Sequence, residues 1–157
     1  MGRRDWLGLG AFVALCFVIS AIGGALTGLS LATWYRTLSK PAFNPPDWVF
    51  APVWTLLFLM IAVAGWRVWR VGARAGVRAA MAAYAAQLAL NLAWSALFFG
   101  GRMVGAALAE IALLLAAVCV NALLFWRIDR VAGWLLAPYA AWVTFAMVLN
   151  FALWRLN

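Results

Sequence analysis

Long stretches without charged side chains are the feature that most constrains the fold of this chain. They predict helices near 6–28, 48–70, 79–100, 103–126 and 131–154, since about 20 apolar residues carry a helix across a bilayer. Lipid offers the backbone no hydrogen bonds, so a spanning segment must be a helix or part of a closed barrel. These runs lack the polar–apolar alternation of barrel strands. The sequence therefore predicts an all-α integral membrane protein, a five-helix transmembrane bundle in which residues 1–157 form a single domain.

The composition agrees with a membrane protein and excludes several kinds of enzyme site. Of the 157 residues, 69% are hydrophobic and 10% are charged, against about 45–50% and about 25% in soluble domains. The chain has no histidine, which excludes histidine bases and the usual zinc and haem ligands. With only four acidic residues, we expect no metal site and no required cofactor. Cys16 and Cys119 lie in apolar runs and are expected to be free, buried thiols.

The basic residues lie at the ends of the apolar runs and predict a topology. Eight fall on the N-terminal side and four on the other side: Arg3, Arg4, Arg67, Arg70, Arg74, Arg78, Arg127 and Arg130 against Arg36, Lys40, Arg102 and Arg155. Since cytoplasmic loops carry the excess of Lys and Arg, the N-terminus is expected on the cytoplasmic side of a bacterial cell envelope. The net charge of +8 then indicates contact with lipid headgroups, and no nucleic-acid partner is expected.

The connection between the first two helices, residues 29–47, differs from the short connections elsewhere. It contains several aromatic residues, a lysine and three prolines: Trp34, Tyr35, Lys40, Pro41, Phe43, Pro45 and Pro46. Proline fixes φ and removes a donor, so this segment cannot be helical throughout. We expect an ordered lid loop packed on the bundle, in a position suited to ligand binding.

Tryptophan occurs eleven times, and its positions separate two roles. Six copies sit at run ends, where an interfacial belt is expected: Trp6, Trp66, Trp69, Trp126, Trp134 and Trp154. Trp54, Trp94 and Trp142 lie within runs, and we predict that they face the bundle interior.

Two helices carry polar and aromatic residues along one face. These residues are Gln87, Asn91, Trp94, Ser95 and Phe98 in the third helix, and Tyr139, Trp142, Ala146 and Asn150 in the fifth, where Pro138 predicts a kink. One interpretation is interhelical hydrogen bonding that only holds the bundle together. The other is a mostly apolar cavity for a flat ligand with a polar edge, such as a sterol, a porphyrin or a quinone.

Two further features have mainly structural interpretations. Glu110 is the one acid well inside a run. A buried membrane acid is a candidate functional residue, but Glu110 lies near the run's start, and we interpret it as a structural residue that can reach the interface. Small residues also recur at four-residue spacing, as in Gly24 and Gly28, which permits close helix packing.

Four motifs in order along the chain resemble one family closely. They are Trp34-Tyr35-x4-Lys40-Pro41-x3-Pro45-Pro46-x-Trp48 with Ala51-Pro52-Val53-Trp54; Gln87-Leu88-Ala89-Leu90-Asn91-x2-Trp94; Phe98-Phe99-Gly100; and Pro138-Tyr139-x2-Trp142-x2-Phe145-Ala146-x3-Asn150-x3-Trp154-Arg155. Together with five spans they are similar to the translocator proteins, or tryptophan-rich sensory proteins, of the TspO/MBR family.

The resemblance implies a homodimeric five-helix bundle that binds tetrapyrroles such as protoporphyrin IX, with cholesterol as a ligand in animal members. By motif position, the ligand-binding residues would be Tyr35, Trp54, Asn91, Trp94, Phe98, Trp142, Phe145 and Ala146. Trp34, Lys40, Pro41, Pro45 and Pro46 would belong to the lid loop. The cholesterol-recognition pattern of animal members has a tyrosine where this chain has Phe151, which favours a porphyrin over a sterol.

We therefore expect a membrane translocator or sensor protein whose partners are a tetrapyrrole or sterol, membrane lipid and a second copy of the chain. Two alternatives stay open. Some bacterial relatives degrade protoporphyrin in light, and the positions matching Trp54 and Trp142 are implicated there. The other alternative is a regulatory adaptor whose partner binding depends on ligand occupancy.

Overall fold

The computed structural model describes residues 2–157. In chain order it contains α1 (Arg3–Leu31), α2 (Trp34–Thr37), α3 (Asp47–Trp69), α4 (Val77–Ser95), the π-helical turn η1 (Ala96–Gly100), α5 (Val104–Ile128), α6 (Arg130–Leu135) and α7 (Ala137–Leu156). Within these residues there is no strand, and five helical segments are long and apolar enough to cross a membrane. The predicted all-α bundle of five membrane helices is confirmed.

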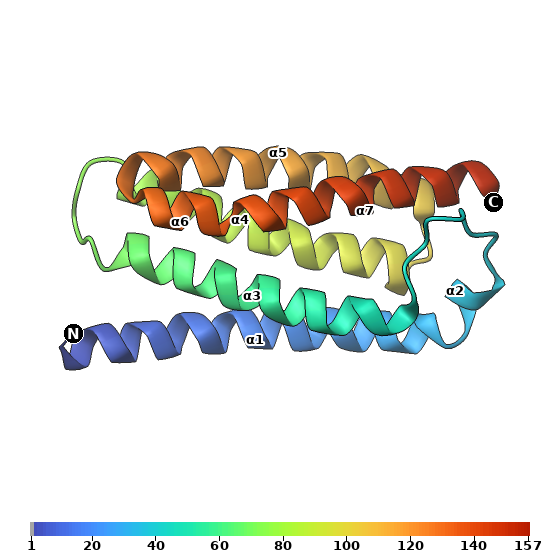
Figure 1. Cartoon of the computed structure of the whole chain (residues 1–157), viewed down its shortest axis with the longest axis horizontal. Coiled ribbons are helices and arrows are strands. Elements are labelled where there is room, and N and C mark those ends of the chain that lie inside the picture. The colour runs from blue at the N-terminus through green and yellow to red at the C-terminus, as the bar shows by residue number, and fades with distance from the viewer. Residues whose placement is uncertain (1) are drawn as a thin grey trace.

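The long helices run side by side, and the chain reverses direction at each connection (Figure 1). The N-terminus and the α3–α4 connection lie at one end of the bundle, while α2 and the C-terminus lie at the other. α1 packs on α3, α4 packs on α5, and α5 packs on α7. The α3 backbone also lies close to α6 but farther from α7. The two backbones of α3 and α7 are therefore more widely spaced than those of the other packed pairs.

The helices extend past several boundaries predicted from charge. α1 spans Arg3–Leu31 rather than 6–28, because Arg3, Arg4 and Asp5 belong to its first turn and Asp5 Oδ2 accepts a hydrogen bond from the Gly2 N–H at 3.1 Å. The connection to α3 is correspondingly shorter than the predicted 29–47. It covers 32–46 and includes the short helix α2, and this segment is the lid loop from here on.

The fifth membrane segment is interrupted at the predicted place. α6 ends at Leu135 and α7 begins at Ala137, with Pro138 in its first turn. Proline has no N–H to continue the ladder, and the Leu136 N–H instead donates to the Gly133 carbonyl at 3.1 Å in a tight turn. Asp129 starts α6 by accepting from the N–H groups of Val131 and Ala132.

A π-helical turn at the end of α4 was not predicted from the sequence. The Gly101 N–H donates to the Ala96 carbonyl at 2.7 Å, five residues back instead of four. The wider turn alters which side chains face inward. Phe98 and Phe99 are consecutive, yet both are buried, and the Ser30 hydroxyl of α1 donates to the Phe99 carbonyl at 2.6 Å.

Two predictions of burial are wrong. Cys16 is buried, with its Sγ 3.3 Å from the Tyr84 hydroxyl, but Cys119 is exposed on the outer side of α5, which buries a single face. Trp66 was expected in the interfacial belt, yet it is buried and its indole N–H donates to the Asp5 carbonyl at 2.9 Å. Both cysteines are free.

Candidate functional site

The principal cavity lies between α1, α3 and α4 and has a volume of about 320 Å³. We call it the main cavity. The residues that line it are of three kinds: apolar and aromatic (Ile19, Leu31, Phe50, Ala51, Trp54, Phe58, Trp94, Phe99), polar or charged (Ser20, Thr27, Asp47, Asn91, Ser95) and glycine (Gly23, Gly24, Gly28). Its volume is at the lower end of the range for small-molecule pockets, about 300–1,000 Å³.

The α1 wall of the main cavity is the part that sequence reasoning missed. Gly24 and Gly28 were expected to support helix packing, but a Cβ built on either would meet no atom within 4 Å. A Cβ on Gly23 would lie 3.5 Å from the Ser95 hydroxyl, across the cavity on α4. The missing side chains leave room beside α1, so these glycines form a cavity wall. The one available signal was their clustering with Ser20 and Thr27 on a single helix.

Three predicted binding residues, Trp54, Asn91 and Trp94, line the main cavity. The Asn91 amide Nδ2 donates to the Tyr139 hydroxyl at 3.0 Å, which fixes the carboxamide in position. Its Oδ1 accepts no hydrogen bond within residues 2–157 and stays available to a ligand donor. The Trp94 indole N–H is already used, donating to Asn150 Oδ1 at 3.1 Å. Trp94 therefore offers its aromatic face rather than a donor.

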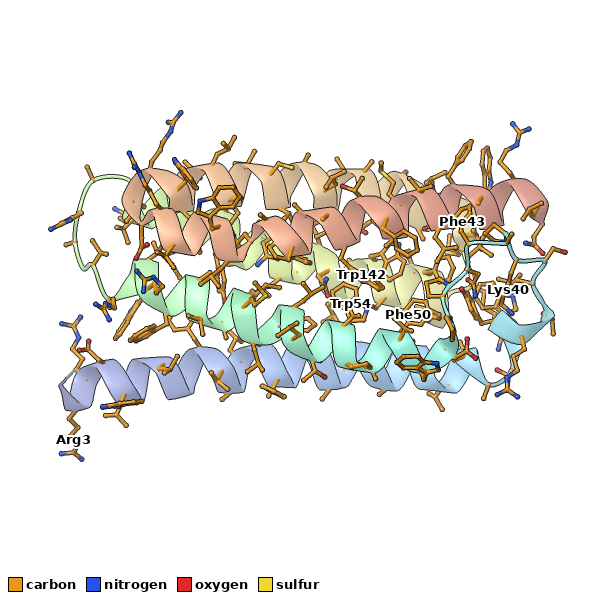
Figure 2. All side chains as sticks on the ribbon, viewed as in Figure 1. Arg3, Lys40, Phe43, Phe50, Trp54 and Trp142 are labelled. Carbon is orange, nitrogen blue, oxygen red and sulfur yellow. The ribbon has the colours of Figure 1, made fainter. Side chains whose placement is uncertain are left out.

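The other predicted binding residues lie next to the main cavity, around a much smaller space of about 20 Å³. We call it the aromatic crevice. It is bordered by Tyr35, Phe98, Trp142, Phe145 and Ala146 among others, and it shares Phe50, Trp94 and Phe99 with the main cavity. Figure 2 shows Phe50, Trp54 and Trp142 in the space between α3 and α7. The structure thus divides the predicted site into two spaces separated by aromatic side chains.

The lid loop is tied to the bundle at several points. The Tyr35 hydroxyl donates to Asn44 Oδ1 at 2.6 Å, and the Asn44 amide donates to the Pro45 carbonyl at 3.0 Å. Trp34 packs edge-on against Phe98, and Phe43 packs against Phe145 of α7. The Asn157 side chain exchanges two hydrogen bonds with the Ser39 backbone, at 3.0 and 3.1 Å. This pattern agrees with the expected ordered lid over the aromatic end of the bundle.

The lid loop also brings charge to this end of the bundle. The Lys40 ammonium lies 4.9 Å from the centroid of the Tyr35 ring, a cation–π contact, and forms no ion pair within residues 2–157. Burial, with a smaller contribution from the nearby Asp47 carboxylate, raises the pKa of Tyr35 to about 12. The phenol is therefore neutral at physiological pH, and its O–H donates the hydrogen bond to Asn44 Oδ1.

Polar groups without partners lie on α4 and α5. Both polar atoms of the Gln87 side chain and both carboxyl oxygens of Glu110 are buried without a hydrogen-bond partner within residues 2–157. Glu110 lies on the buried face of α5 with Leu114 and Asn121, so the expectation that it reaches the interface is wrong. The face pattern explains this: Glu110 and Asn121 are eleven residues, three helical turns, apart.

Replacing Glu110 with methionine is expected to stabilise the protein. The substitution removes a buried polar group that has no partner, a group that costs about 1–3 kcal/mol, and keeps a similar volume. Thermal unfolding in detergent should show a higher midpoint for Glu110→Met and a smaller change for Glu110→Gln, which stays polar. A lower midpoint for Glu110→Met would show that the carboxyl group is partnered and contributes to stability.

Comparison with known proteins decides the family. The model of the TspO/MBR family matches residues 12–155. The chain belongs to the TspO/MBR family. It is 41% identical to the tryptophan-rich protein TspO of Chlorobaculum tepidum over 99% of both chains. It is 40% identical to the tryptophan-rich sensory protein of Cereibacter sphaeroides, over 99% of this chain and 94% of the relative. It is 36% identical to the translocator protein of Homo sapiens, over 79% of this chain and 75% of the relative.

This TspO/MBR protein is a multi-pass membrane protein, consistent with its five apolar helices. The matched range begins in α1 and ends in α7. It therefore includes the glycine wall of the main cavity, the lid loop and the aromatic crevice.

Proposed function

We propose that this protein is a membrane translocator or sensor that binds a tetrapyrrole in the main cavity. The observation that carries the proposal is a cavity of about 320 Å³ with aromatic walls, one glycine wall and few polar groups. That lining suits a flat, mostly apolar ligand held by a small number of hydrogen bonds. Membership of a family whose relatives are named translocator or sensory proteins supports the same function.

The arrangement of the walls favours a planar ligand. The three glycines of α1 leave part of one side without side chains, and Trp54 and Phe50 of α3 stand on another. A ring system can stack on the indole while lying close to the α1 backbone. Phe50, Trp94 and Phe99 line both this space and the aromatic crevice, so a macrocycle larger than the main cavity would need these side chains to move.

Charge at the lid loop supports a carboxylate-bearing tetrapyrrole in preference to a sterol. Lys40 is half-buried in the lid loop and free of ion pairs within residues 2–157. Lys40 lies against the Tyr35 ring, which borders the aromatic crevice, so its ammonium would attract the propionates of a protoporphyrin IX held with its acidic edge toward the lid. Arg36, Arg102 and Arg155 add positive charge to the same end of the bundle.

The topology is part of the proposal. The end of the bundle that holds the N-terminus and the α3–α4 connection carries eight of the twelve basic residues. We assign that end to the cytoplasmic side of a bacterial membrane by the positive-inside rule, which places the lid loop on the opposite side.

The experiment compares protoporphyrin IX with its dimethyl ester in the purified full chain, by titration in detergent in the dark. Wild type should bind the diacid saturably and more tightly than the ester. Lys40→Gln should weaken diacid binding about tenfold and leave the ester unchanged, since about 1.4 kcal/mol corresponds to tenfold in affinity. The matched control is Arg74→Gln, which removes an equal charge at the other end of the bundle.

Two results would contradict the proposal. Non-saturable partition of the porphyrin into wild type would exclude a defined tetrapyrrole site. Equal weakening by Lys40→Gln and Arg74→Gln would show that net charge, and not the lid loop, attracts the diacid.

A further inference from the structure

We propose that a groove between α3 and α7 is the portal through which the ligand passes between the bilayer and the main cavity. The groove has a volume of about 400 Å³ and opens on the outer surface of the bundle. Its lining is apolar and includes Val53, Leu56, Pro138, Ala141, Trp142 and Phe145. The proposal rests on the proposed function, because its occupant is the flat, mostly apolar ligand in transit.

The groove has a clear structural origin. The α3 backbone lies close to α6 but farther from α7, which it meets mainly through aromatic side chains such as Phe50 and Trp142, and the helix interruption at Leu136 separates these two parts of the fifth membrane segment. Pro138 and Ala141 at the start of α7 are exposed and have small side chains. The outer part of the space between the helices is therefore open, and in a bilayer it faces acyl chains rather than water.

Shared aromatic side chains link the groove to the aromatic crevice and the crevice to the main cavity. Trp142 and Phe145 line both the groove and the aromatic crevice, with their ring centroids 5.4 Å apart. On the inner side, Trp142 packs edge-on against Phe50 at 6.3 Å, and Phe50 lines both the crevice and the main cavity. Figure 2 shows Trp142, Trp54 and Phe50 in this region between the two helices. Trp142, Phe145 and Phe50 therefore form a chain of aromatic contacts that leads from the groove to the main cavity.

This route keeps the apolar macrocycle of the ligand out of water at every stage. Passage through the lid loop would break the Tyr35–Asn44 hydrogen bond and the paired bonds between Ser39 and Asn157. It would also carry the aromatic ring system through the headgroup region. Passage through the groove requires rotation of Trp142 and Phe145, which are only half-buried and have lipid on one side. The apolar lining of the groove matches the macrocycle of the ligand.

The test measures protoporphyrin IX association and dissociation rates with the full chain in lipid nanodiscs. Ala141→Phe narrows the groove from its α7 side, and the matched control Ala116→Phe adds the same ring to an exposed membrane face of α5. We expect Ala141→Phe to slow both rates at least tenfold and to leave the equilibrium Kd within about twofold of wild type. A blocked portal raises the energy barrier between the ligand in the bilayer and the ligand in the main cavity. It does not change the free energy of either state, so the Kd stays the same. Leu56→Trp, from the α3 side, should act in the same direction if Ala141→Phe does not fold.

A second arm tests passage through the lid loop. Ser39→Cys and Asn157→Cys, combined with Cys119→Ala to remove the exposed thiol, place two cysteines where a thiol cross-linker can fasten the lid loop to α7. With the groove as the portal, cross-linking leaves both rates within about twofold. Rates slowed by the cross-link, together with Ala141→Phe matching Ala116→Phe, would overturn the portal while leaving the proposed function intact. A wild type without saturable binding would overturn both.

Discussion

Replacing Gly23 with leucine is expected to reduce protoporphyrin IX affinity at least 100-fold while the protein stays folded. A Cβ at Gly23 would lie 3.5 Å from the Ser95 hydroxyl, which is ordinary van der Waals contact. The first atom of the new side chain therefore fits, and its remaining atoms must extend into the main cavity. A 100-fold loss corresponds to about 2.7 kcal/mol of binding free energy, which is reasonable when a wall of a cavity of about 320 Å³ is filled.

The measurement is a protoporphyrin IX titration of Gly23→Leu beside Gly10→Leu, both in the purified full chain. Gly10 also lies in α1, and a Cβ there meets no atom within 4 Å, but it does not line the cavity. Both variants replace a helical glycine, which favours the helix by about 1 kcal/mol, so both should unfold at or above the wild-type temperature. Undiminished binding by Gly23→Leu would place the ligand outside the main cavity.

Replacing Gly65 with leucine should strongly destabilise the protein. A Cβ on Gly65 would lie 2.6 Å from Tyr84 Cζ and 2.9 Å from Phe12 Cδ1, closer than atoms can approach. The Tyr84 ring has little freedom to move: its hydroxyl lies 3.3 Å from both Cys16 Sγ and the Ile61 carbonyl, and the ring stacks on Phe125. Overpacking of a core costs about 1–3 kcal/mol or more, and a leucine at this contact is expected to lie above that range.

Thermal unfolding and size-exclusion elution in detergent would check this expectation. Gly65→Leu should give little folded protein, whereas Gly10→Leu should match wild type. Combining Gly65→Leu with Tyr84→Leu should recover part of the lost stability, because it removes the ring atoms that collide. A Gly65→Leu protein as stable as wild type would show that α3 and α4 can move apart at this position.

The ligand-facing part of the site illustrates what one sequence can and cannot predict. Periodicity placed Asn91, Trp94 and Ser95 on one buried face of α4, because the geometry of a helix fixes which residues share a face. It could not indicate that Trp142 and Phe145 would line a crevice and an outer groove instead of the main cavity. That depends on the spacing between α3 and α7, which is set by contacts between segments far apart in the chain.

Glycine is the residue for which the sequence was least informative. Gly65 permits close packing of Tyr84 and Phe12, whereas Gly24 and Gly28 border empty space. The residue type is the same and each lies inside an apolar helix. Only the neighbouring helix determines whether the missing side chain brings helices together or leaves a cavity between them.

The sequence by itself determined the membrane environment, the five spanning helices, the position of the lid loop and the break near Pro138. Each of these follows from local physical rules: hydrocarbon thickness sets helix length, charge marks the ends, and proline lacks a donor. Tertiary structure alone decided the position of the cavity beside α1, the burial of Glu110, the exposure of Cys119 and the groove between α3 and α7. These features depend on distances between helices, and inside a membrane an apolar side chain can face lipid as readily as protein.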